Sequence, residues 1–586
     1  MSFSNKYRDC TTAAINERVG GSALIAGWVE NIRDHGGVMF VDLRDFYGTV
    51  QVVIKDNALL TGIRKESAVS IAGEVAARDP ETYNPEIATG ELELIARSVT
   101  VLGQVYESLP FEPMTSKECG EETRLKYRFL DLRNKSMRDT MILRSRVIAH
   151  MREIMTAADF LEMQTPILTA SSPEGARDFL IPSRKHHGKF YALPQAPQIF
   201  KQLLMVSGFD RYFQIAPCFR DEDARADRTA GEFYQLDLEM AFATQDDVMS
   251  AGEAVIAALV GEFSNPKRCL SDFPRISYKD AMLKYGTDKP DLRNPLFIVD
   301  ISPLFVDSDF KPFCNKVVRA MRVPEMGAQS KSFFKSMEDF ALSIGMKGLG
   351  YVKMDEDGSF LGPIDKFLTD ESRAAVRTMT DVAAGDVVYF VAESDAKTAA
   401  KYAGQIRSEI ANRLELVDEN DFKACWITDF PFYEADDSGK PQFGHNPFSM
   451  PQGELEALNG VAAGSTDALA LLAYQYDFVL NGVELASGAV RNHNPDIMLK
   501  AFEIAGFTED DVRSKFGALY SAFKFGAPPH AGMAFGVDRL LMLLLREENV
   551  RETIAFPLNS NAQDIMLGSP SEVSELQLRE THIKIR

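Results

Sequence analysis

The stretch that decides the fold is RYFQIAPCFRDEDARADRTAGEFYQLDLEM, residues 211–240. Its two ends, 212–219 and 233–240, alternate apolar and polar residues, and a segment crowded with charges of both signs separates them. This alternation predicts two β-strands that form a hairpin with an unusually long loop. An ordinary surface hairpin does not need such a loop, which makes the loop a candidate functional segment.

Arg220 closes the first of these strands, and Glu222 follows two residues later. Strand alternation therefore predicts that both side chains leave the same face of the sheet. A guanidinium can bind a phosphate through two parallel hydrogen bonds, and a carboxylate can accept from an amino group or hold a metal ion. The pair suits a nucleotide, and a solvated charged loop is the alternative from this stretch alone.

The second informative stretch is GAPPHAGMAFGVDRLLMLLLR, residues 526–546. Prolines and glycines precede a short apolar strand at 531–535, and an apolar helix is predicted from Gly536 to Leu545. Free N–H groups at the start of a helix attract anions, so Arg539 in the first turn would lie where a phosphate binds. Ordinary packing of a strand against a helix is the alternative.

Together these stretches resemble the second and third signature motifs of the class II aminoacyl-tRNA synthetases. Residues 219–222, FRDE, match Phe-Arg-x-Glu, and residues 536–539, GVDR, match Gly-x-Asp-Arg. The first motif of that class ends in a proline after a dimer-forming helix, and FLEMQTP at 160–166 fits it. Three motifs in this order are far more specific than any one of them.

The bulk properties of the chain limit the possible classes of protein. A chain of 586 residues is too long for one core and predicts two to four domains. It has no run of about eighteen apolar residues and begins MSFSNKYRDC, so we expect neither export nor membrane insertion. Its six cysteines are scattered without metal-ligand spacing, which predicts free thiols in a reducing cytoplasm.

The net charge of -21 makes loose, non-specific binding of nucleic acid improbable, because phosphates are normally neutralised by clustered Lys and Arg. Local charge differs from the total, and the segment 124–146 has eight basic residues against Asp131 and Asp139. This segment is either a surface for a phosphate backbone or a solvated helix face.

Residues 23–102 show a strand pattern throughout, with five short strands separated by Gly, Asn, Pro and Asp turns. This predicts a small barrel of the OB type, whose open face commonly binds single-stranded nucleic acid. Alternation places Phe40 and Gln51 where an unstacked base could stack or form hydrogen bonds. A core or ordinary surface position is the alternative for both residues.

The same region resembles the N-terminal anticodon-binding domain of aspartyl-tRNA synthetases. The resemblance implies that Arg33, Phe40, Gln51 and Glu93 contact the anticodon. Members of that family that charge only their own tRNA tend to have leucine where His35 stands, and members with histidine often also aspartylate tRNA(Asn). We therefore expect that His35 contributes to tRNA binding and that tRNA(Asn) is charged, with strict discrimination as the alternative.

The resemblance to the bacterial type of this family covers nearly the whole chain and implies a multidomain α+β architecture. The expected parts are an OB-fold anticodon-binding domain (1–105), a linker or hinge (106–130), an antiparallel-sheet catalytic domain in two parts (131–285 and 416–586) and an inserted α+β domain (286–415). The inserted segment has no residue pattern that indicates chemistry, so we expect a packed accessory domain.

Alternation in YDFVLNGVELASGAVR brings Asp477 and Glu484 to neighbouring strands across an Asn481-Gly482 turn, a sequence typical of a type I′ hairpin. Two close carboxylates repel each other unless a cation lies between them, so Mg²⁺ bridged to phosphates is the expected occupant. Surface carboxylates on an edge hairpin are the alternative.

The resemblance implies that ATP activates L-aspartate to aspartyl-adenylate and that aspartate is then transferred to the 3′ end of tRNA(Asp). A carboxylate is already a nucleophile at neutral pH, so catalysis would come from positioning and charge neutralisation. The implied catalytic residues are Arg220, Glu222 and Arg539. The implied ATP contacts are Arg220, Asp221, Glu222, Glu484, Gly536, Val537, Asp538 and Arg539.

Selection of aspartate requires cations for its side-chain carboxylate and an anion for its ammonium group. Lys201 and Arg491 would supply the cations, and Glu174 and Asp237 the anion. His445 would add a hydrogen bond, with a buried structural histidine as the alternative. The full set of residues that the resemblance places at the aspartate is Glu174, Gln195, Gln198, Lys201, Arg220, Asp237, His445 and Arg491.

Two other functions remain open at this point. The first is an asparaginyl- or lysyl-tRNA synthetase, which shares the barrel and the three motifs. The second is a nucleic-acid-binding or regulatory protein that has lost catalysis, although the intact Arg220, Glu222, Glu484 and Arg539 argue against it. The helix before Pro166 also predicts a homodimer, because that element pairs subunits in the class II enzymes.

Overall fold

The computed structural model describes residues 4–171, 176–306 and 308–585. The chain forms two compact units, Met1–Glu112 and Pro113–Arg586. The first unit is a barrel, and the second contains a large mixed sheet and the inserted domain. The predicted multidomain α+β architecture is confirmed.

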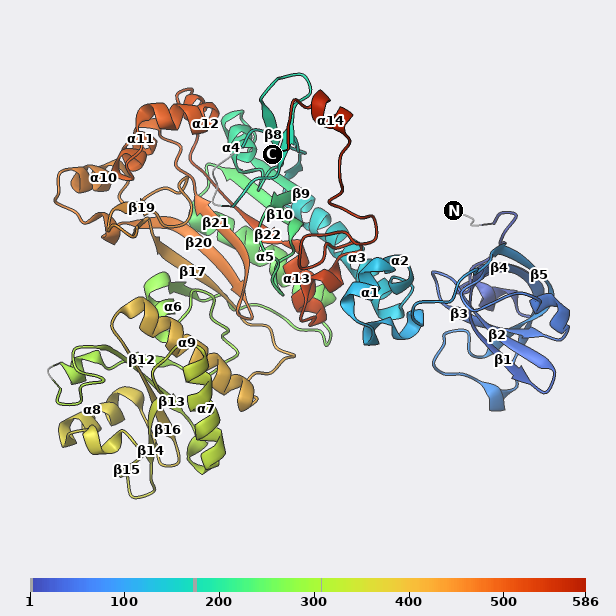
Figure 1. Ribbon diagram of the computed structural model, residues 1–586, viewed down its shortest axis with the longest axis horizontal. Helices are drawn as coiled ribbons and strands as arrows, with labels where there is room; N and C mark the ends of the chain where they lie inside the picture. The colour runs from blue at the N-terminus through green and yellow to red at the C-terminus, as the bar shows by residue number, and fades with distance from the viewer. Residues whose placement is uncertain (1–3, 172–175, 307, 586) are drawn as a thin grey trace. The chain divides into compact units, whose positions relative to one another are not determined.

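The N-terminal unit is a closed barrel with the strand order β1-β2-β3-β5-β4 (Figure 1). Alternating residues such as Val41, Leu43, Val50 and Val52 are fully buried in its interior. This alternation is the pattern from which the barrel was predicted. Its strands are β1 (Ser22–His35), β2 (Val38–Arg44), β3 (Thr49–Ile54), β4 (Ala68–Ala77) and β5 (Leu92–Gly103).

The large sheet of the second unit, called the catalytic sheet below because it forms the region expected to be the catalytic domain, has eight strands in the order β11-β17-β20-β21-β22-β10-β9-β6 (Figure 1). Its pairs are antiparallel except β11 with β17 and β6 with β9, which lie at the two edges. The strands are β6 (Leu161–Glu162), β9 (Arg211–Arg220), β10 (Gly231–Ala241), β11 (Arg275–Ser277), β17 (Ala424–Pro431), β20 (Leu472–Leu480), β21 (Val483–Val490) and β22 (His530–Gly536).

The stretch 211–240 forms the predicted hairpin, with Arg220 of β9 opposite Gly231 of β10. The strands are longer than predicted, so that the charged loop comprises residues 221–230. Because β9 ends at Arg220, strand alternation does not extend to Glu222. The expected common face for these two side chains therefore has no basis in the strand geometry.

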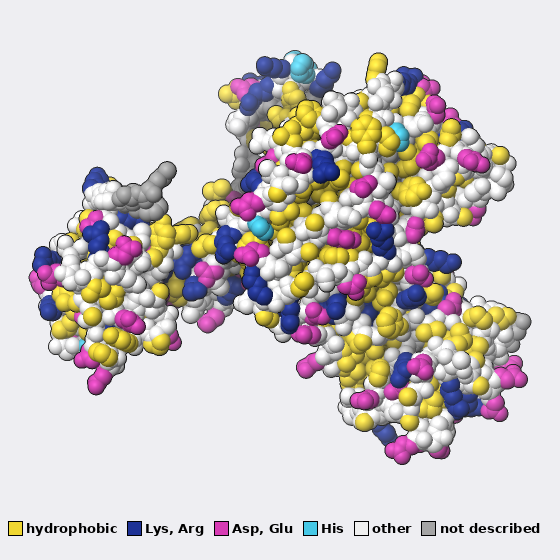
Figure 2. All heavy atoms as spheres, turned by 180° about the vertical axis from the view of Figure 1, so that it is seen from behind, with side chains coloured by type: hydrophobic (Ala, Val, Ile, Leu, Met, Phe, Trp, Pro, Cys, Tyr) yellow, Lys and Arg dark blue, Asp and Glu magenta, His cyan; other side chains and the backbone are white. Residues whose placement is uncertain are grey.

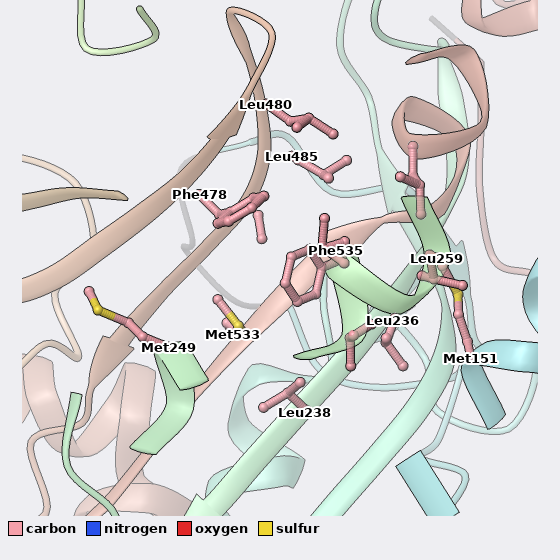
Figure 3. Packing of buried hydrophobic residues seen from close by; sticks show 14 of the residues in the cluster. Met151, Leu236, Leu238, Met249, Leu259, Phe478, Leu480, Leu485, Met533 and Phe535 are labelled. Carbon is pink, nitrogen blue, oxygen red and sulfur yellow. The ribbon is translucent and has the colours of Figure 1, made fainter. Parts of the chain in front are cut away.

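One face of the sheet is covered by helices α3 (Lys135–Ala157), α5 (Gln245–Phe263) and α13 (Val537–Leu545), and the main apolar core lies between them and the sheet. Leu236 and Leu238 of β10 and Met533 and Phe535 of β22 point into this core (Figure 3). The residues between them in sequence must point to the opposite face. That second face is available for a site.

Residues from Pro113 onward belong to the larger unit, although the sequence assigned 106–130 to a linker. The reason is a set of buried ion pairs made by helix α1 (Glu121–Lys126) and helix α2 (Arg128–Asp131). Arg124 forms ion pairs with Asp131 at 3.1 Å and with Glu552 at 2.8 Å. These contacts attach the segment firmly to the C-terminal part of the chain.

Part of the basic segment 124–146 is bound within the protein and is not open to a phosphate backbone. Arg128 donates to the carbonyl oxygens of Ile554 and Ala555 at 2.7 and 2.9 Å, and Arg144 forms an ion pair with Asp538. Together with Arg124, three of the eight basic side chains are therefore bound within the protein. On the face drawn in Figure 2, Lys and Arg side chains are interspersed with Asp and Glu.

The inserted domain has its own antiparallel sheet in the order β12-β13-β16-β14-β15. Alternating residues of β16 enter two different apolar clusters, with Tyr389 and Val391 in one and Val388 and Phe390 in the other. Both faces of this sheet are thus buried, as predicted for a packed domain. Its elements are β12 (Ile298–Asp300), β13 (Val317–Val323), α7 (Lys331–Ser343), β14 (Gly350–Met354), β15 (Phe360–Leu361), α8 (Asp370–Thr380), β16 (Val387–Glu393) and α9 (Ala396–Arg413).

The remaining elements surround the catalytic sheet or precede the inserted domain. Within the described ranges, no helix is long and apolar enough to span a membrane. These elements are β7 (Leu180–Pro182), β8 (Phe190–Ala192), α4 (Gln198–Val206), α6 (Tyr278–Lys284), β18 (Tyr433–Ala435), β19 (Pro441–Phe443), α10 (Glu454–Ala462), α11 (Pro495–Ile504), α12 (Glu509–Phe523) and α14 (Glu575–Glu580).

Candidate active site

A cavity of about 430 Å³ lies on the face of the catalytic sheet opposite the apolar core. This volume falls in the range of ordinary small-molecule sites. Residues far apart in the sequence meet here, including eleven that were predicted as site residues. These are Gln198, Lys201, Arg220, Asp237, His445, Asp477, Glu484, Arg491, Gly536, Asp538 and Arg539.

Four charged side chains form a completely buried network at the base of the cavity. Nζ of Lys201 lies 2.6 Å from Oδ1 of Asp237 and 3.3 Å from Oε2 of Glu239. Glu239 also accepts hydrogen bonds from Arg491, at 2.9 Å from Nε and 3.3 Å from Nη2. Oδ2 of Asp237 is buried and receives no hydrogen bond from the described residues, so it is available to a donor group of a ligand.

Glu239 stays ionised in this network despite its burial. Burial by itself raises the pKa of a carboxyl group, but the charges of Arg491 and Lys201 outweigh it and lower the pKa of Glu239. Strand β22 passes very close to Glu239 of β10, as shown by the position of Gly532. A Cβ atom at Gly532 would lie only 1.9 Å from Oε2 of Glu239. Gly532 therefore allows β22 to pass beside the carboxylate.

A buried histidine, His530, lies beside this network. His530 is fully buried, with Nδ1 2.8 Å from the carbonyl oxygen of Pro528 and Nε2 3.2 Å from Oε1 of Gln202. Burial lowers the pKa of His530, which favours the neutral imidazole. A neutral ring adds no further positive charge beside Lys201 and Arg491.

The two motif arginines line the same cavity, although they are 319 residues apart in sequence. The guanidinium of Arg220 lies over the ring of Phe233 at 5.0 Å, and its buried Nε has no hydrogen-bond partner in the part of the chain that the structure describes. Arg539 donates from Nη1 to the carbonyl oxygen of Glu484 at 2.7 Å and from Nε to that of Asp227 at 3.1 Å. Both arginines are thus positioned and retain donors for an anion.

The hairpin of β20 and β21 places a carboxylate pair at the side of the cavity. Asn481 and Gly482 connect the strands with φ values of 51° and 78°, as the predicted type I′ turn requires. Oδ1 of Asp477 is buried and forms no hydrogen bond with any described residue. Burial, and secondarily the charge of Glu484, raises the pKa of Asp477 well above its usual range. A cation beside this pair would offset the free energy that is needed to keep two close carboxylates charged.

A lysine already lies at this pair. Nζ of Lys289 is 2.9 Å from Oε2 of Glu484, and Lys289 and its neighbour Asp288 both line the cavity. Among the described residues there is no group of three or more His, Cys, Asp or Glu side chains that could hold a metal ion. Two carboxylates suffice only for a cation whose other ligands are water and phosphate oxygens, as is usual for Mg²⁺.

Four predicted site residues do not line the cavity. Gln195 precedes α4 and bonds to the backbone of Ala176, at 2.9 Å from Nε2 to the carbonyl oxygen. Asp221 donates its N–H to the carbonyl oxygen of Arg177, and Glu222 is bound by Arg228. Val537 is fully buried in the apolar core. These residues shape the surrounding segments in the ligand-free protein.

Glu174 and His445 are the two other residues that were predicted to bind aspartate. Glu174 lies outside the described residues. His445 lines the cavity, packs edge-on against Phe430 with ring centres 5.0 Å apart, and has Nε2 4.0 Å from Oε1 of Glu434. His445 is exposed, which contradicts the alternative of a buried structural histidine.

The predicted residues of the barrel lie on one outer face of its strands. Arg33 of β1 is opposite Phe40 of β2, and Gln51 of β3 is opposite Glu93 of β5. Arg33 forms a two-point ion pair with Asp42 at 2.6 and 2.8 Å, and Gln51 donates to Glu93 at 3.2 Å.

His35 is exposed at the end of β1, with its ring edge-on to Phe40 at 5.5 Å. The turn that follows consists of Gly36 and Gly37, both with positive φ. The barrel therefore presents an aromatic ring, an imidazole and several hydrogen-bonding groups on one surface.

Some cavity residues escaped the sequence-based prediction. Glu239 follows Asp237 by two residues on β10, so strand alternation alone could have identified it. Lys289 and Asp288 had no such signal, because they belong to the start of the inserted domain. Asp227 and Arg228 belong to the hairpin loop, whose path the sequence does not specify.

Comparisons with known proteins agree with this geometry. A family model described as tRNA synthetases class II (D, K and N) matches residues 120–560, and one described as an OB-fold nucleic acid binding domain matches residues 23–102. The aspartate–tRNA(Asp/Asn) ligase of Rickettsia canadensis (strain McKiel) is 51% identical over 594 residues, covering 99% of this chain and 98% of that protein. The aspartate–tRNA ligase of Streptomyces avermitilis is 52% identical over 588 residues, covering 99% of each.

Solved structures show the same fold at much lower identity. A putative aspartyl-tRNA synthetase from Leishmania major Friedlin matches with a TM-score of 0.58 at 20% identity, covering 95% of each chain. An asparaginyl-tRNA synthetase from Pyrococcus horikoshii matches with a TM-score of 0.55 at 18% identity, covering 92% of this chain and 95% of that one.

Proposed function

Because the chain belongs to the class II tRNA synthetases of the aspartate, lysine and asparagine type, we propose that it is an aspartate–tRNA ligase. It activates L-aspartate with ATP to aspartyl-adenylate and transfers the aspartyl group to the 3′ end of tRNA(Asp). The relatives that support this activity are aligned over nearly their whole length.

The observation that carries the choice of amino acid is the buried pair of cations, Lys201 and Arg491. A carboxylate side chain gains charge-assisted hydrogen bonds from them, whereas an amide leaves a buried guanidinium partly unpaired. Asparagine is therefore rejected by several kcal/mol, about 2–4, on this argument. A lysine side chain would meet like charges, which excludes the lysine-specific alternative.

The remaining groups of the pocket suit the other end of the amino acid. The free Oδ2 of Asp237 accepts from the ammonium group of aspartate, and Glu174 would assist from outside the described residues. Gln198 has a buried Nε2 without a hydrogen-bond partner among residues 4–171, 176–306 and 308–585, and Gln195 orders the preceding segment. His445 closes the pocket near the bound side chain.

Activation requires that the α-carboxylate of aspartate attack the α-phosphate of ATP. The carboxylate needs no base, so the residues act by orienting the two reactants and neutralising charge at phosphorus. Arg220 binds the α-phosphate and Arg539 the γ-phosphate, which bends the triphosphate between two fixed guanidinium groups. Gly536, Val537 and Asp538 form the turn that aims Arg539, with Asp538 held by Arg144 and by the N–H of Tyr234 at 3.0 Å.

Glu222 is the third catalytic candidate, and Asp221 and Glu484 are further ATP contacts. Glu222 is paired with Arg228, so it reaches the nucleotide only if that ion pair rearranges. The exposed fractions of both side chains are about a quarter, which leaves room for such a change. The intact charged set argues against a catalytically inactive nucleic-acid-binding protein.

Mg²⁺ fits the carboxylate pair of Asp477 and Glu484. The support is the buried Oδ1 of Asp477, which has no hydrogen bond, together with the preference of Mg²⁺ for oxygen ligands. When bound, the ion would neutralise charge on the phosphate oxygens. Asp477 lies within β20, and Glu484 is the second residue of β21 after the turn.

We further propose that both tRNA(Asp) and tRNA(Asn) are charged. Arg33, Phe40, Gln51 and Glu93 would contact the anticodon, and His35 beside Phe40 would tolerate the anticodon base that differs between the two tRNAs. The relatives bear names of both the relaxed and the strict kind, so they leave this choice open. A cytoplasmic location follows from tRNA as the substrate.

The protein is proposed to act as a homodimer through the element around α3 and β6. Leu161, Ile167 and Leu168 are apolar side chains that are each about half exposed here, and β6 is an edge strand of the sheet. Such an exposed edge is usually covered by another element or chain.

Two measurements test the proposal. Pyrophosphate exchange should depend on L-aspartate, and exchange with asparagine or lysine at equal or greater efficiency would refute the amino-acid assignment. Charging of purified tRNA(Asp) and tRNA(Asn) with aspartate should succeed for both. Charging of tRNA(Asp) alone would leave the ligase activity intact but exclude relaxed specificity.

A further inference from the structure

Lys289 comes from a part of the chain that was not expected to contribute to the active site. It lies between α6 and β12, in the segment 286–294 that leads into the inserted domain. Its Nζ nevertheless lies 2.9 Å from Oε2 of Glu484, inside the cavity that contains Arg220 and Arg539. The inserted domain thus begins with a cation at the nucleotide site.

The inserted domain holds this segment in place. A Cβ at Gly286 would lie 2.4 Å from the carbonyl oxygen of Ala400 on α9, so the backbones are in close contact. Arg407, also on α9, is buried and donates to the carbonyl oxygens of Asp291, Asn294 and Leu296 at 3.1, 2.8 and 2.6 Å. Three hydrogen bonds from one rigid helix fix the backbone that follows Lys289.

The other side of the segment packs against the hairpin that bears the carboxylate pair. A Cβ at Gly482 would lie 3.1 Å from Cβ of Asp291, which places the segment directly on the β20–β21 turn. Arg293 binds both carboxylate oxygens of Asp291 and also Glu419 at 3.1 Å. Lys289 is therefore supported by the inserted domain on one side and by the catalytic sheet on the other.

The electrostatic surroundings of Lys289 are strongly negative. Its ammonium group meets Glu484 at 2.9 Å and Asp288 at 3.8 Å, and Asp477 contributes from the neighbouring strand. Burial alone lowers the pKa of a lysine, but these three carboxylates outweigh it and raise the pKa of Lys289. The side chain is 40% exposed, so it retains freedom to move.

We propose that Lys289 is a polyphosphate-binding residue that the inserted domain supplies to the active site, and that it neutralises the Asp477–Glu484 pair until the nucleotide arrives. In the free protein its ammonium group takes the place of a divalent cation beside Glu484. When ATP binds with its cation, the ammonium group turns to the β- and γ-phosphates. This inference rests on the proposed ATP-dependent function and extends it.

The argument for the exchange is one of charge. A lysine and a divalent cation cannot both occupy the same position beside Glu484 without repulsion. The triphosphate brings about four negative charges into the cavity, and the flexible four-carbon stem of Lys289 allows the ammonium group to follow them. The side chain of Lys289 is 40% exposed, against 27% for that of Arg539, which leaves its ammonium group more room to turn.

The test compares nucleotides that differ only in the phosphates that Lys289 would contact. Affinities for ATP and AMP are measured by calorimetry, with magnesium, on the full-length protein and on Lys289→Met. Loss of one charge-assisted contact should weaken ATP binding about 10–100-fold, while AMP binding changes less than about twofold. Lys289→Arg, which keeps the charge, should stay within about fivefold of the wild type.

A second measurement uses Mn²⁺ alone as the probe, followed by electron paramagnetic resonance without nucleotide. Lys289→Met should bind Mn²⁺ about tenfold or more tightly than the wild type, because the competing ammonium group is gone. Lys284→Met is the matched control, since Lys284 lies five residues earlier on α6 in an exposed contact with Asp280 and outside the cavity lining. It should change neither measurement.

The outcomes are distinct. Equal weakening of ATP and AMP, or no weakening of ATP, would refute a contact with the polyphosphate. Unchanged Mn²⁺ affinity would refute the exchange of cations. Failure of the proposed function itself would be recognised separately, as absence of aspartate-dependent pyrophosphate exchange in the wild-type protein.

Discussion

Nε of Arg491 donates a hydrogen bond to Oε1 of Glu239 at 2.9 Å, and both side chains are almost completely buried. The carboxylate thereby orients a guanidinium that is expected to select the substrate. Because Glu239 also contacts Lys201, it balances both cations of the pocket in the free protein. Under the proposed function, specificity for aspartate would depend on Glu239, a residue that itself need not touch the ligand.

We expect Glu239→Gln to destabilise the catalytic unit by about 3–5 kcal/mol, because it leaves a buried cation without its partner. Urea unfolding followed by the fluorescence of the buried Trp426 measures this. The second tryptophan of the chain, Trp28, is replaced by Phe in both proteins so that the barrel adds no signal. Glu503→Gln, at an exposed ion pair with Lys500, should cost less than about 1 kcal/mol. If the two variants lost similar amounts of stability, Glu239 would not be the partner that compensates the buried cations.

Arg491→Lys should reduce kcat/KM for aspartate in pyrophosphate exchange by about 10–100-fold, because lysine keeps the charge but cannot form two parallel hydrogen bonds. The KM for ATP should change less than about twofold, since Arg220 and Arg539 remain in place. If both substrates were affected equally, Arg491 would be a structural residue and not one that selects aspartate.

The stability of the protein should fall in mild acid because of His530. Burial lowers the pKa of His530 in the folded state, while the unfolded chain titrates near 6.5. Below about pH 6.5 the unfolded state therefore binds more protons, and stability decreases by up to about 1.4 kcal/mol per pH unit. His530→Gln should reduce this slope, as measured by urea midpoints at pH 7.5, 6.5 and 5.5. Parallel slopes for the two proteins would show that His530 does not contribute.

His35→Leu should lower the charging efficiency of tRNA(Asn) by about tenfold, equivalent to about 1.4 kcal/mol, with tRNA(Asp) nearly unchanged. The physical reason is loss of a polar ring beside Phe40 on the proposed anticodon surface. Initial rates with each purified tRNA measure the effect. Pyrophosphate exchange without tRNA serves as the control and should not respond.

Leu161→Arg should shift the protein from dimer to monomer, because it places a charge on the apolar edge strand β6. Multi-angle light scattering gives the mass directly. A matched substitution at another half-exposed leucine, Leu361→Arg in the inserted domain, should leave the mass unchanged. A wild-type protein that is already monomeric would refute the proposed dimer.

Much of the fold was predictable because it depends on local patterns. Alternation in 211–240 specified a hairpin, and the Asn481-Gly482 turn specified another, since only a few residues favour two successive positive φ values. The motif arginines were predictable as well, because each stands at the end of a strand or the start of a helix. The barrel followed from the same periodicity.

The sequence did not show which charged groups would be bound in ion pairs or hydrogen bonds within the protein. The sequence pattern predicted that Arg124 and Arg128 are surface cations. In the structure both are buried and bind acceptors at residues 552–555, which are distant in the chain. Glu222 reads as a nucleotide ligand, yet in the ligand-free protein Arg228 binds it. Such pairings depend on where segments hundreds of residues apart, or the two ends of a long loop, meet.

The sequence by itself determined the hairpin strands, their turns and eleven of the residues that line the candidate active site, because these follow from short-range periodicity, backbone preferences and motifs. Only the tertiary structure decided that Glu239 orients Arg491, that Val537 belongs to the core, and that Lys289 of the inserted domain reaches Glu484. The physical reason is that burial and the partner of each charge are set by packing between elements distant in the chain, for which a single sequence contains no local signal.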